Sequence, residues 1–313
     1  MKVPSTLASL AVPAACFVAG YVAHYILNRK PRASSRYHLD PTLACLTKHQ
    51  SPITQTSTWI NLGLWTSDDL SFPAACEQLA LRLGQAARLS ALDSVLDVGC
   101  GRGDQCVLWH DHFKVAQTAG IDITPEHVAS AKLLVEQRHL SSSIEIHHAS
   151  VADLLTLDVI KTKNVTKILS CDAAYHFTTR MDFFANAFAL LQAGGMLALI
   201  DIVVSEEVLS WKGLDHIQLR GLCSMASIPF ENLRTPAQYQ ADLESAGFVN
   251  VQIEALHEVA SGFASFVARQ SHQLGEWSLG ADFEKFEMVG AVLAACAQHK
   301  YMHFVVATGE KPK

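Results

Sequence analysis

The strongest constraint on the fold is a short apolar strand that runs directly into a turn with three alternating glycines. Residues 94–98 are Ser-Val-Leu-Asp-Val, and Gly99, Gly101 and Gly103 follow, with Asp104 directly after them. An apolar run of this kind is typical of a buried parallel strand, and glycines allow a sharp turn into a helix whose first N–H groups are unpaired. We therefore predict the first strand–turn–helix unit of a ligand-binding sheet.

The turn departs from the dinucleotide-binding pattern G-x-G-x-x-G. Its third glycine is spaced differently, and Asp104 stands where a pyrophosphate would approach the helix. This departure disfavours a nicotinamide-dependent oxidoreductase, which stays as an alternative. A second alternative is a cofactor-binding scaffold without catalytic activity.

Apolar runs alternate with helical patterns along the rest of the chain. This alternation predicts an α/β fold, a Rossmann-like seven-stranded and mostly parallel sheet with helices on both faces and the ligand at the carboxyl edge. Helices at about residues 205–233 are predicted to form a lid over the site. The strands are predicted at residues 94–98, 118–122, 144–148, 167–172, 196–202, 248–256 and 301–307.

Polar residues fall at the ends of several predicted strands. Asp122 lies 25 positions after Asp97 and ends the second strand, where a carboxylate can accept hydrogen bonds from both hydroxyls of a ribose. The alternative is an acid that only caps the next helix. His176 and Asp201 follow the fourth strand and end the fifth, so both are expected at the same edge.

Taken together, the motifs between residues 59 and 307 resemble class I S-adenosylmethionine-dependent methyltransferases. The similarity is to the small-molecule enzymes, which include sterol, tocopherol, sarcosine/dimethylglycine and natural-product sugar O-methyltransferases. The motifs are Asn-x-Gly-x-Trp at 61–65, Leu-Asp-Val-Gly-Cys-Gly-x-Gly at 96–103, Gly-Ile-Asp-Ile-Thr-Pro at 120–125, Tyr-His-Phe-x-x-Arg at 175–180, Ala-Gly-Gly-x-Leu at 193–197 and Ala-Gly-Phe at 246–248.

The resemblance implies S-adenosylmethionine as cofactor and a small metabolite, lipophilic or not, as methyl acceptor. Ser150 stands where the family usually has an aspartate, so we expect the adenine contacts either to be weaker or to be carried by the Val151 backbone. The implied cofactor residues are Asp97, Gly99, Cys100, Gly101, Gly103, Gln105, Asp122, Ile123, Ser150, Val151 and Cys171.

The resemblance also implies catalytic residues. In sugar O-methyltransferases a histidine after the fourth strand acts as base and an aspartate ending the fifth is its partner, and these match His176 and Asp201. A histidine suits this role because its ordinary pKa is about 6.5. The alternative is that His176 only caps a helix. Thr178 and Thr179 replace a common Pro-Asp, which leaves the acceptor and its methylated atom open.

The N-terminal residues predict a membrane anchor. Residues 3–27 carry no charge, and this stretch is longer than the roughly 20 apolar residues that a transmembrane helix needs. Four basic residues follow between positions 29 and 36, which predicts a catalytic domain facing the cytosol from the endoplasmic reticulum or another internal membrane. A cleaved signal peptide or a buried apolar helix are the alternatives. The predicted domains are an anchor at 1–28, a linker at 29–57 and a methyltransferase domain at 58–313.

Composition restricts the kinds of ligand and partner that we expect for the chain. The net charge is −6, which disfavours a nucleic-acid substrate. The eight cysteines form no C-x-x-C pair, so neither a metal site nor a disulfide framework is predicted. The oligomeric state stays open. Trp59 and Trp65 are expected either to fill gaps in the core or to belong to a lid over the cofactor.

Overall fold

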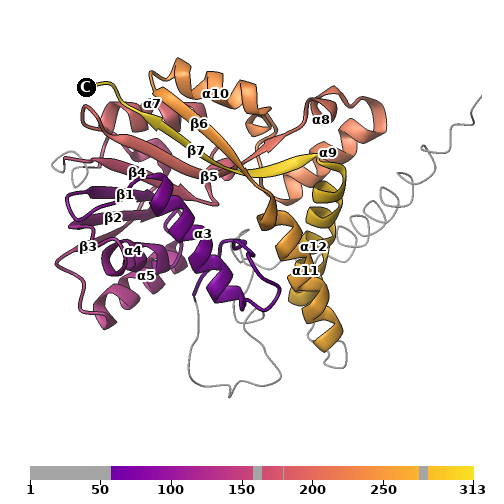
Figure 1. The fold of residues 1–313 in the computed structure, drawn as a ribbon, viewed down its shortest axis with the longest axis horizontal. Helices are drawn as coiled ribbons and strands as arrows, with labels where there is room; N and C mark the ends of the chain where they lie inside the picture. The colour runs from indigo at the N-terminus through magenta and orange to yellow at the C-terminus, as the bar shows by residue number, and fades with distance from the viewer. Residues whose placement is uncertain (1–57, 158–163, 179, 275–280) are drawn as a thin grey trace, which may run out of the picture.

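The computed structural model describes residues 58–157, 164–178, 180–274 and 281–313. These residues form one seven-stranded sheet with helices packed on it (Figure 1). The strand order is β3-β2-β1-β4-β5-β7-β6, and each strand overlaps its predicted range. The strands are β1 (Ser94–Val98), β2 (Gln117–Asp122), β3 (Ile144–His148), β4 (Lys167–Cys171), β5 (Met196–Val204), β6 (Val249–Leu256) and β7 (Met302–Glu310). The helices are α3 (Phe72–Ala86), α4 (Asp104–Asp111), α5 (Pro125–Gln137), η1 (Val151–Asp153), η2 (Ala174–His176), α7 (Arg180–Leu190), α8 (Glu206–Ser210), α9 (Gly213–Met225), η3 (Phe230–Asn232), α10 (Pro236–Ser245), α11 (His257–Leu274) and α12 (Ala281–His299).

The sheet is mixed. The strands from β3 to β5 run parallel to one another, whereas β7 is antiparallel to both of its neighbours, β5 and β6. All nine residues of β5 are buried, as expected for an apolar strand that is covered on both faces. Because β1, β2, β4 and β5 point the same way, their carboxyl ends meet at one edge of the sheet, which we call the carboxyl edge.

Helices cover both faces of the sheet (Figure 1). On one face α3 and α4 share a core with α11, and this core includes the buried Leu79, Trp109 and Phe263. On the other face α7 and α10 enclose a second core around Phe183 and Tyr239. The sheet is thus held between two apolar layers, and its carboxyl edge is the place where polar side chains gather.

The residues before α3 connect that helix to the carboxyl edge, and we name residues 58–65 the covering segment. Trp65 is 6% exposed and stacks on Phe266, with ring centroids 4.6 Å apart. The backbone N–H of Leu64 donates to the carbonyl of Ala75 at 2.8 Å. Trp65 therefore fills the core, while Trp59 is half-buried against the same core.

The membrane part of the predicted fold class is corrected. Within the described ranges, no helix is both long enough and apolar enough to cross a bilayer. The predicted anchor and linker, residues 1–57, lie outside the described residues. The fold is therefore a Rossmann-like mixed sheet with helices, and the single-span anchor and the membrane localisation that depended on it are withdrawn. The prediction was wrong because it rested on the hydropathy of one terminal segment alone.

The close approach of α11 to Trp65 gives a test of this packing. A Cβ on Gly262 would lie 2.1 Å from the Cβ of Trp65, an atom that cannot move without the backbone. Gly262→Ala is therefore expected to lower the free energy of unfolding by about 1–3 kcal/mol, measured by urea denaturation. Gly221→Ala on α9 is the matched control, because nothing lies within 4 Å of its added Cβ. Equal effects of the two substitutions would contradict this account.

Candidate active site

The turn after β1 requires its glycines. Gly99, Gly101 and Gly103 have φ values of 78°, 57° and 92°, which lie in the left-handed region that side chains rarely adopt. A Cβ on Gly99 would lie 2.7 Å from the Cβ of Ala173, and one on Gly103 would lie 2.9 Å from the Cβ of Ala131. The turn therefore packs as bare backbone against the loop after β4 and against α5.

Asp122 at the tip of β2 holds this turn. Its Oδ2 accepts the backbone N–H of Gly101 at 3.0 Å, and its Oδ1 accepts the N–H of Thr124 at 2.8 Å. The Nδ1 of His127 lies 3.3 Å from Oδ1. Burial by itself would raise the pKa of Asp122, but the bonds from His127, Thr124 and Gly101 lower it below its ordinary value. Asp122 therefore stays ionised and acts as an acceptor at the carboxyl edge.

Asp97 lies beneath the turn, with no exposed surface. Its carboxylate accepts hydrogen bonds from Gln105 Nε2 and Trp109 Nε1, both at 2.7 Å, and from Cys106 Sγ at 3.6 Å. Burial raises the pKa of Asp97 to about 6, although the bonds from Trp109, Gln105 and Cys106 oppose the rise. The structure thus joins Asp97 and Gln105, two predicted cofactor residues, in a network that fixes α4 under the turn.

The other predicted cofactor residues lie around the same edge. Ile123 is 59% exposed beside Asp122, which is unusual for a large apolar side chain. Ser150 begins η1 with a complete capping box, and Val151 is half-buried there. Cys100 and Cys171 are only 2% and 4% exposed, so their thiols contribute to packing under the site.

His176 lies in η2, directly after β4. Its Nδ1 is 3.1 Å from the carbonyl oxygen of Ser227, in the turn after α9. Because a carbonyl oxygen only accepts hydrogen bonds, Nδ1 carries the proton and Nε2 carries the lone pair. Burial lowers the pKa of His176 to about 4, so the ring is neutral near pH 7. The side chain therefore has the tautomer of a base that uses Nε2.

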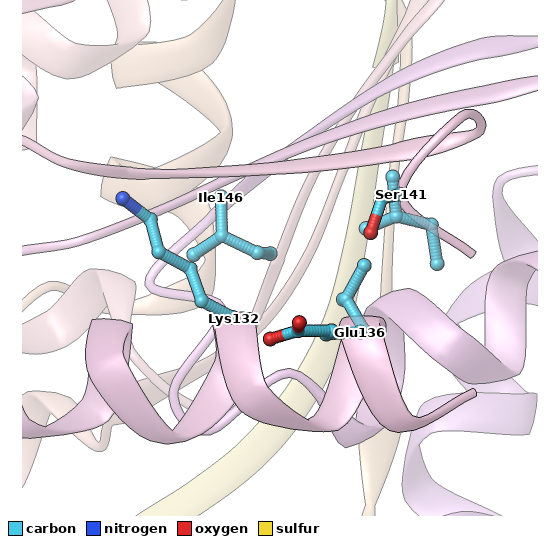
Figure 2. A pocket seen from close by; sticks show the side chains of 6 residues that line it. Lys132, Glu136, Ser141 and Ile146 are labelled. Atoms are coloured by element: carbon cyan, nitrogen blue, oxygen red, sulfur yellow. The ribbon is translucent and has the colours of Figure 1, made fainter. Parts of the chain in front are cut away.

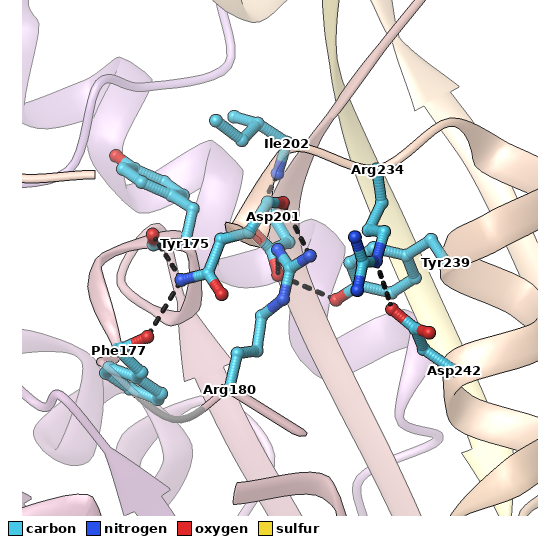
Figure 3. Close-up of polar contacts among 9 residues, drawn as sticks. Tyr175, Phe177, Arg180, Asp201, Ile202, Arg234, Tyr239 and Asp242 are labelled. Carbon is cyan, nitrogen blue, oxygen red and sulfur yellow. Dashed lines mark hydrogen bonds and ion pairs between the residues drawn. The ribbon is translucent and has the colours of Figure 1, made fainter. Parts of the chain in front are cut away.

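Asp201 is joined to partners other than His176. Its Oδ2 accepts from the hydroxyl of Tyr239 at 2.7 Å and from Arg180 Nη1 at 3.3 Å, and its Oδ1 accepts from the N–H of Ile202 at 2.8 Å (Figure 3). Burial raises the pKa of Asp201, while Arg180 and Tyr239 oppose the rise. The predicted pair of His176 and Asp201 is thus on one edge without a hydrogen bond between the two side chains.

A chain of contacts links Asp201 to the loop that carries His176. Arg180, which is 2% exposed, donates from Nη2 to the carbonyl of Asn232 at 2.6 Å. The Asn232 amide in turn donates to the carbonyls of Tyr175 at 2.9 Å and Phe177 at 2.8 Å (Figure 3). These two carbonyls flank His176, so Asp201 is connected to the loop of the histidine through Arg180 and Asn232.

A hollow lies between α5 and the start of β3 (Figure 2). Because it lies at the amino end of β3, it is separate from the residues described above. It is lined by Lys132, Val135, Glu136, Ser141, Ile144 and Ile146.

Comparison with known families shows which family the chain belongs to. Residues 89–246, just over half of the 313, match the family model described as "Methyltransferase domain". The chain belongs to the S-adenosylmethionine-dependent methyltransferases. The predicted enzyme class and cofactor are therefore confirmed, and the oxidoreductase and scaffold alternatives are set aside.

Individual relatives agree with this assignment. The chain is 33% identical over 210 residues to "Erythromycin 3''-O-methyltransferase" of Saccharopolyspora erythraea, a match that spans 66% of this chain and 66% of that protein, just under two thirds of its length. It is 23% identical over 257 residues to "27-O-demethylrifamycin SV methyltransferase" of Amycolatopsis mediterranei, covering 80% of this chain and 89% of that protein. A solved structure of a "putative sarcosine dimethylglycine methyltransferase from Galdieria sulphuraria" has a TM-score of 0.65 at 15% identity, covering 81% of this chain and 93% of that chain, and supports the fold alone.

The carboxyl edge fits the methyltransferase cofactor. The bare turn lets a ligand approach the backbone, Asp122 offers an ionised acceptor, and Ile123 offers an apolar surface beside it. Arg102, on the turn itself, has a buried Nε that lacks a hydrogen-bond partner among the described residues. An unpaired buried donor of this kind suits a carboxylate, such as that of a methionyl group. No cluster of three or more potential metal ligands occurs among the residues that the structure describes.

Sequence reasoning missed Asp172 and Tyr175 at this methyltransferase edge. Asp172 follows β4 with a φ of 59°, and its carboxylate accepts from the hydroxyl of Tyr175 at 2.7 Å and from the N–H of Leu62 at 2.8 Å. Burial raises the pKa of Asp172 to about 7. An available signal was that Asp172 is the last residue of a predicted strand, the same feature that singled out Asp122.

Asp97→Asn is expected to change how stability depends on pH. Because the pKa of Asp97 is raised from 3.8 to about 6 in the folded chain, folding takes up a proton. The associated stabilisation is full below about pH 4 and is lost as the pH rises through about 6. Relative to the unaltered chain, Asp97→Asn should therefore gain about 2 kcal/mol in free energy of unfolding between these pH values, measured by urea denaturation.

The exposed Asp182 on α7 supplies a control, Asp182→Asn, for the pH dependence of Asp97→Asn. Any hydrogen bond lost in Asp97→Asn changes the free energy of unfolding by the same amount at every pH. The change that varies with pH therefore reports the raised pKa of Asp97 alone. A relative stability of Asp97→Asn that is flat from about pH 4 to 7 would contradict a raised pKa.

Proposed function

We propose that this methyltransferase acts on a hydroxyl oxygen of a small molecule. The observation that carries the proposal is the neutral His176, whose Nδ1–H donates to Ser227 and whose Nε2 has the lone pair that a hydroxyl proton requires. An alcohol must lose its proton as it is methylated, and a positioned histidine suits that step. The names of the two relatives support it, because both place the methyl group on an oxygen.

The cofactor residues are proposed as a set that spans the carboxyl edge. Asp122 accepts the ribose hydroxyls, Ile123 and Val151 border the adenine, and the turn at residues 99–103 runs along the methionyl part. Asp97, Gln105, Cys100, Cys171 and Ser150 hold these elements in place from beneath or beside them. When bound, the cofactor supplies a methyl group that its sulfonium has already activated.

The protein's own contribution is alignment, removal of a proton and exclusion of water. His176 takes the hydroxyl proton on Nε2 while Ser227 keeps the ring in its orientation. Asp201 does not touch this proton, and it positions the histidine loop through Arg180 and Asn232. The covering segment lies over the glycine turn, where Ile60 approaches Gly101, and shields that part of the edge from water.

The lid supports a small acceptor with an apolar body. Residues 58–313 are proposed as the catalytic unit, with α8, α9 and η3 as the lid at about residues 205–233. Leu214 and Ile217 on α9 are 75% and 65% exposed, and Trp211 and Phe230 are half-buried nearby. These apolar side chains favour a lipophilic acceptor over a highly charged one.

A comparison of acceptor pools tests the proposed reaction. The full chain is incubated with methyl-labelled cofactor and with either hydroxyl-bearing macrolides, sugars and phenols or amines that have no hydroxyl group. Mass spectrometry is expected to find a new methyl ether in the hydroxyl pool alone. Methylation confined to amines, or to carbon, would overturn the proposal.

His176→Gln is expected to lower turnover on the identified acceptor by about 10²–10⁴-fold, because the hydroxyl loses its proton acceptor. Calorimetry with S-adenosylhomocysteine should give an affinity close to that of the unaltered chain. His112→Gln, at the exposed end of α4, is the matched control and should keep full turnover. Full turnover of His176→Gln would remove the proposed base.

A further inference from the structure

Asp172 lies between three parts of the methyltransferase site. Its φ of 59° is in the left-handed region, which is uncommon for a residue with a side chain. The next residue, Ala173, is the one that a Cβ on Gly99 would meet at 2.7 Å. Asp172 therefore stands directly beside the glycine turn.

One hydrogen bond of Asp172 is anchored in the core. The hydroxyl of Tyr175 donates to Oδ1 at 2.7 Å, and Tyr175 itself is only 7% exposed. Its ring meets Phe304 of β7 edge to face, with centroids 6.4 Å apart. Because this partner is held by the core, the Asp172 carboxylate has a fixed orientation.

The other hydrogen bond reaches the covering segment. The backbone N–H of Leu62 donates to Oδ2 at 2.8 Å. Two residues earlier, Ile60 lies over the turn, since a Cβ on Gly101 would be 2.8 Å from its Cδ1. Thr58 donates a further hydrogen bond from its hydroxyl to Asp104 at the start of α4. The segment thus crosses the turn, and Asp172 holds its far side.

The charge around Asp172 is unbalanced. Burial raises its pKa to about 7 despite the bonds from Tyr175 and Leu62, and nearby Asp201 raises it further. Neither of its two donors, the Tyr175 hydroxyl and the Leu62 N–H, carries a charge. A positive charge placed beside the turn would therefore favour the ionised carboxylate and strengthen both of its hydrogen bonds.

We propose that Asp172 is a positioning residue that fastens the covering segment over the glycine turn, and that it does so more firmly for a cationic sulfonium ligand than for a neutral thioether. This inference rests on the proposed function for its ligand, and it needs no knowledge of the acceptor. It assigns to one carboxylate both the closure of the site and the discrimination between methyl donor and demethylated product.

Removing the charge tests the discrimination. Asp172→Asn keeps an acceptor oxygen and the side-chain volume, and calorimetry on the full chain compares S-adenosylmethionine with S-adenosylhomocysteine. The affinity for the sulfonium compound is expected to fall about tenfold more than the affinity for the thioether, because a charge-assisted interaction is lost. Equal losses for both ligands, or no loss for either, would overturn the inference.

Removing the Leu62 N–H, which donates to Asp172, tests whether this hydrogen bond fastens the covering segment. Leu62→Pro lacks the N–H that Asp172 accepts, whereas Leu62→Ala keeps it and serves as the matched control. Hydrogen exchange in peptides covering residues 58–65 is expected to accelerate about tenfold or more in Leu62→Pro relative to Leu62→Ala, with β4 and β5 still protected. Similar exchange in both variants would overturn the inference.

The two proposals fail in different ways. If hydroxyl compounds are never methylated while Asp172→Asn still loses sulfonium binding selectively, the proposed reaction is wrong and the role of Asp172 stands. If methyl ethers form while the two ligands respond equally to Asp172→Asn, the proposed reaction stands and the role of Asp172 is wrong.

Discussion

The hydrogen bond from the Gly101 N–H to the Asp122 carboxylate, together with two bonds to the Ile121 carbonyl, is the constraint from which the site is built. The N–H groups of Gly99 and Cys100 both donate to Ile121 at 2.9 Å, so the turn after β1 is fastened to the end of β2. Only glycine adopts these left-handed conformations without strain. The position of the turn after β1 then fixes where α4 begins and where a ligand meets bare backbone.

Four aspartates at or beside the carboxyl edge show how one fold gives similar acids different tasks. Neutral donors from α4 hold Asp97 in the core, and backbone N–H groups and a histidine keep Asp122 ionised. The cation Arg180 pairs with Asp201 and ties it to the histidine loop. Asp172 has donors without a cation, which leaves it sensitive to the charge of what binds beside it.

The local parts of the site were readable from the residues, and the contacts between distant parts were not. The glycine turn, Asp122 and His176 were found because each lies at or shortly after the end of an apolar strand, which is a short-range pattern. The pairing of Asp201 with Arg180 and Tyr239, and the bond from Leu62 to Asp172, join residues far apart in the chain. Spacing cannot reveal such contacts, and for this reason Asp201 was expected beside His176 and Asp172 was overlooked.

What the sequence by itself determined is the alternation of apolar strands and helices, the turn that only glycine can make, and hence the methyltransferase family. These follow from local backbone sterics and hydrophobic periodicity. The tertiary structure decided which nitrogen of His176 carries the proton, which partner each aspartate takes, and how residues 58–65 lie over the turn. Those outcomes depend on burial and on donors brought from other elements, and both exist only once the chain has folded.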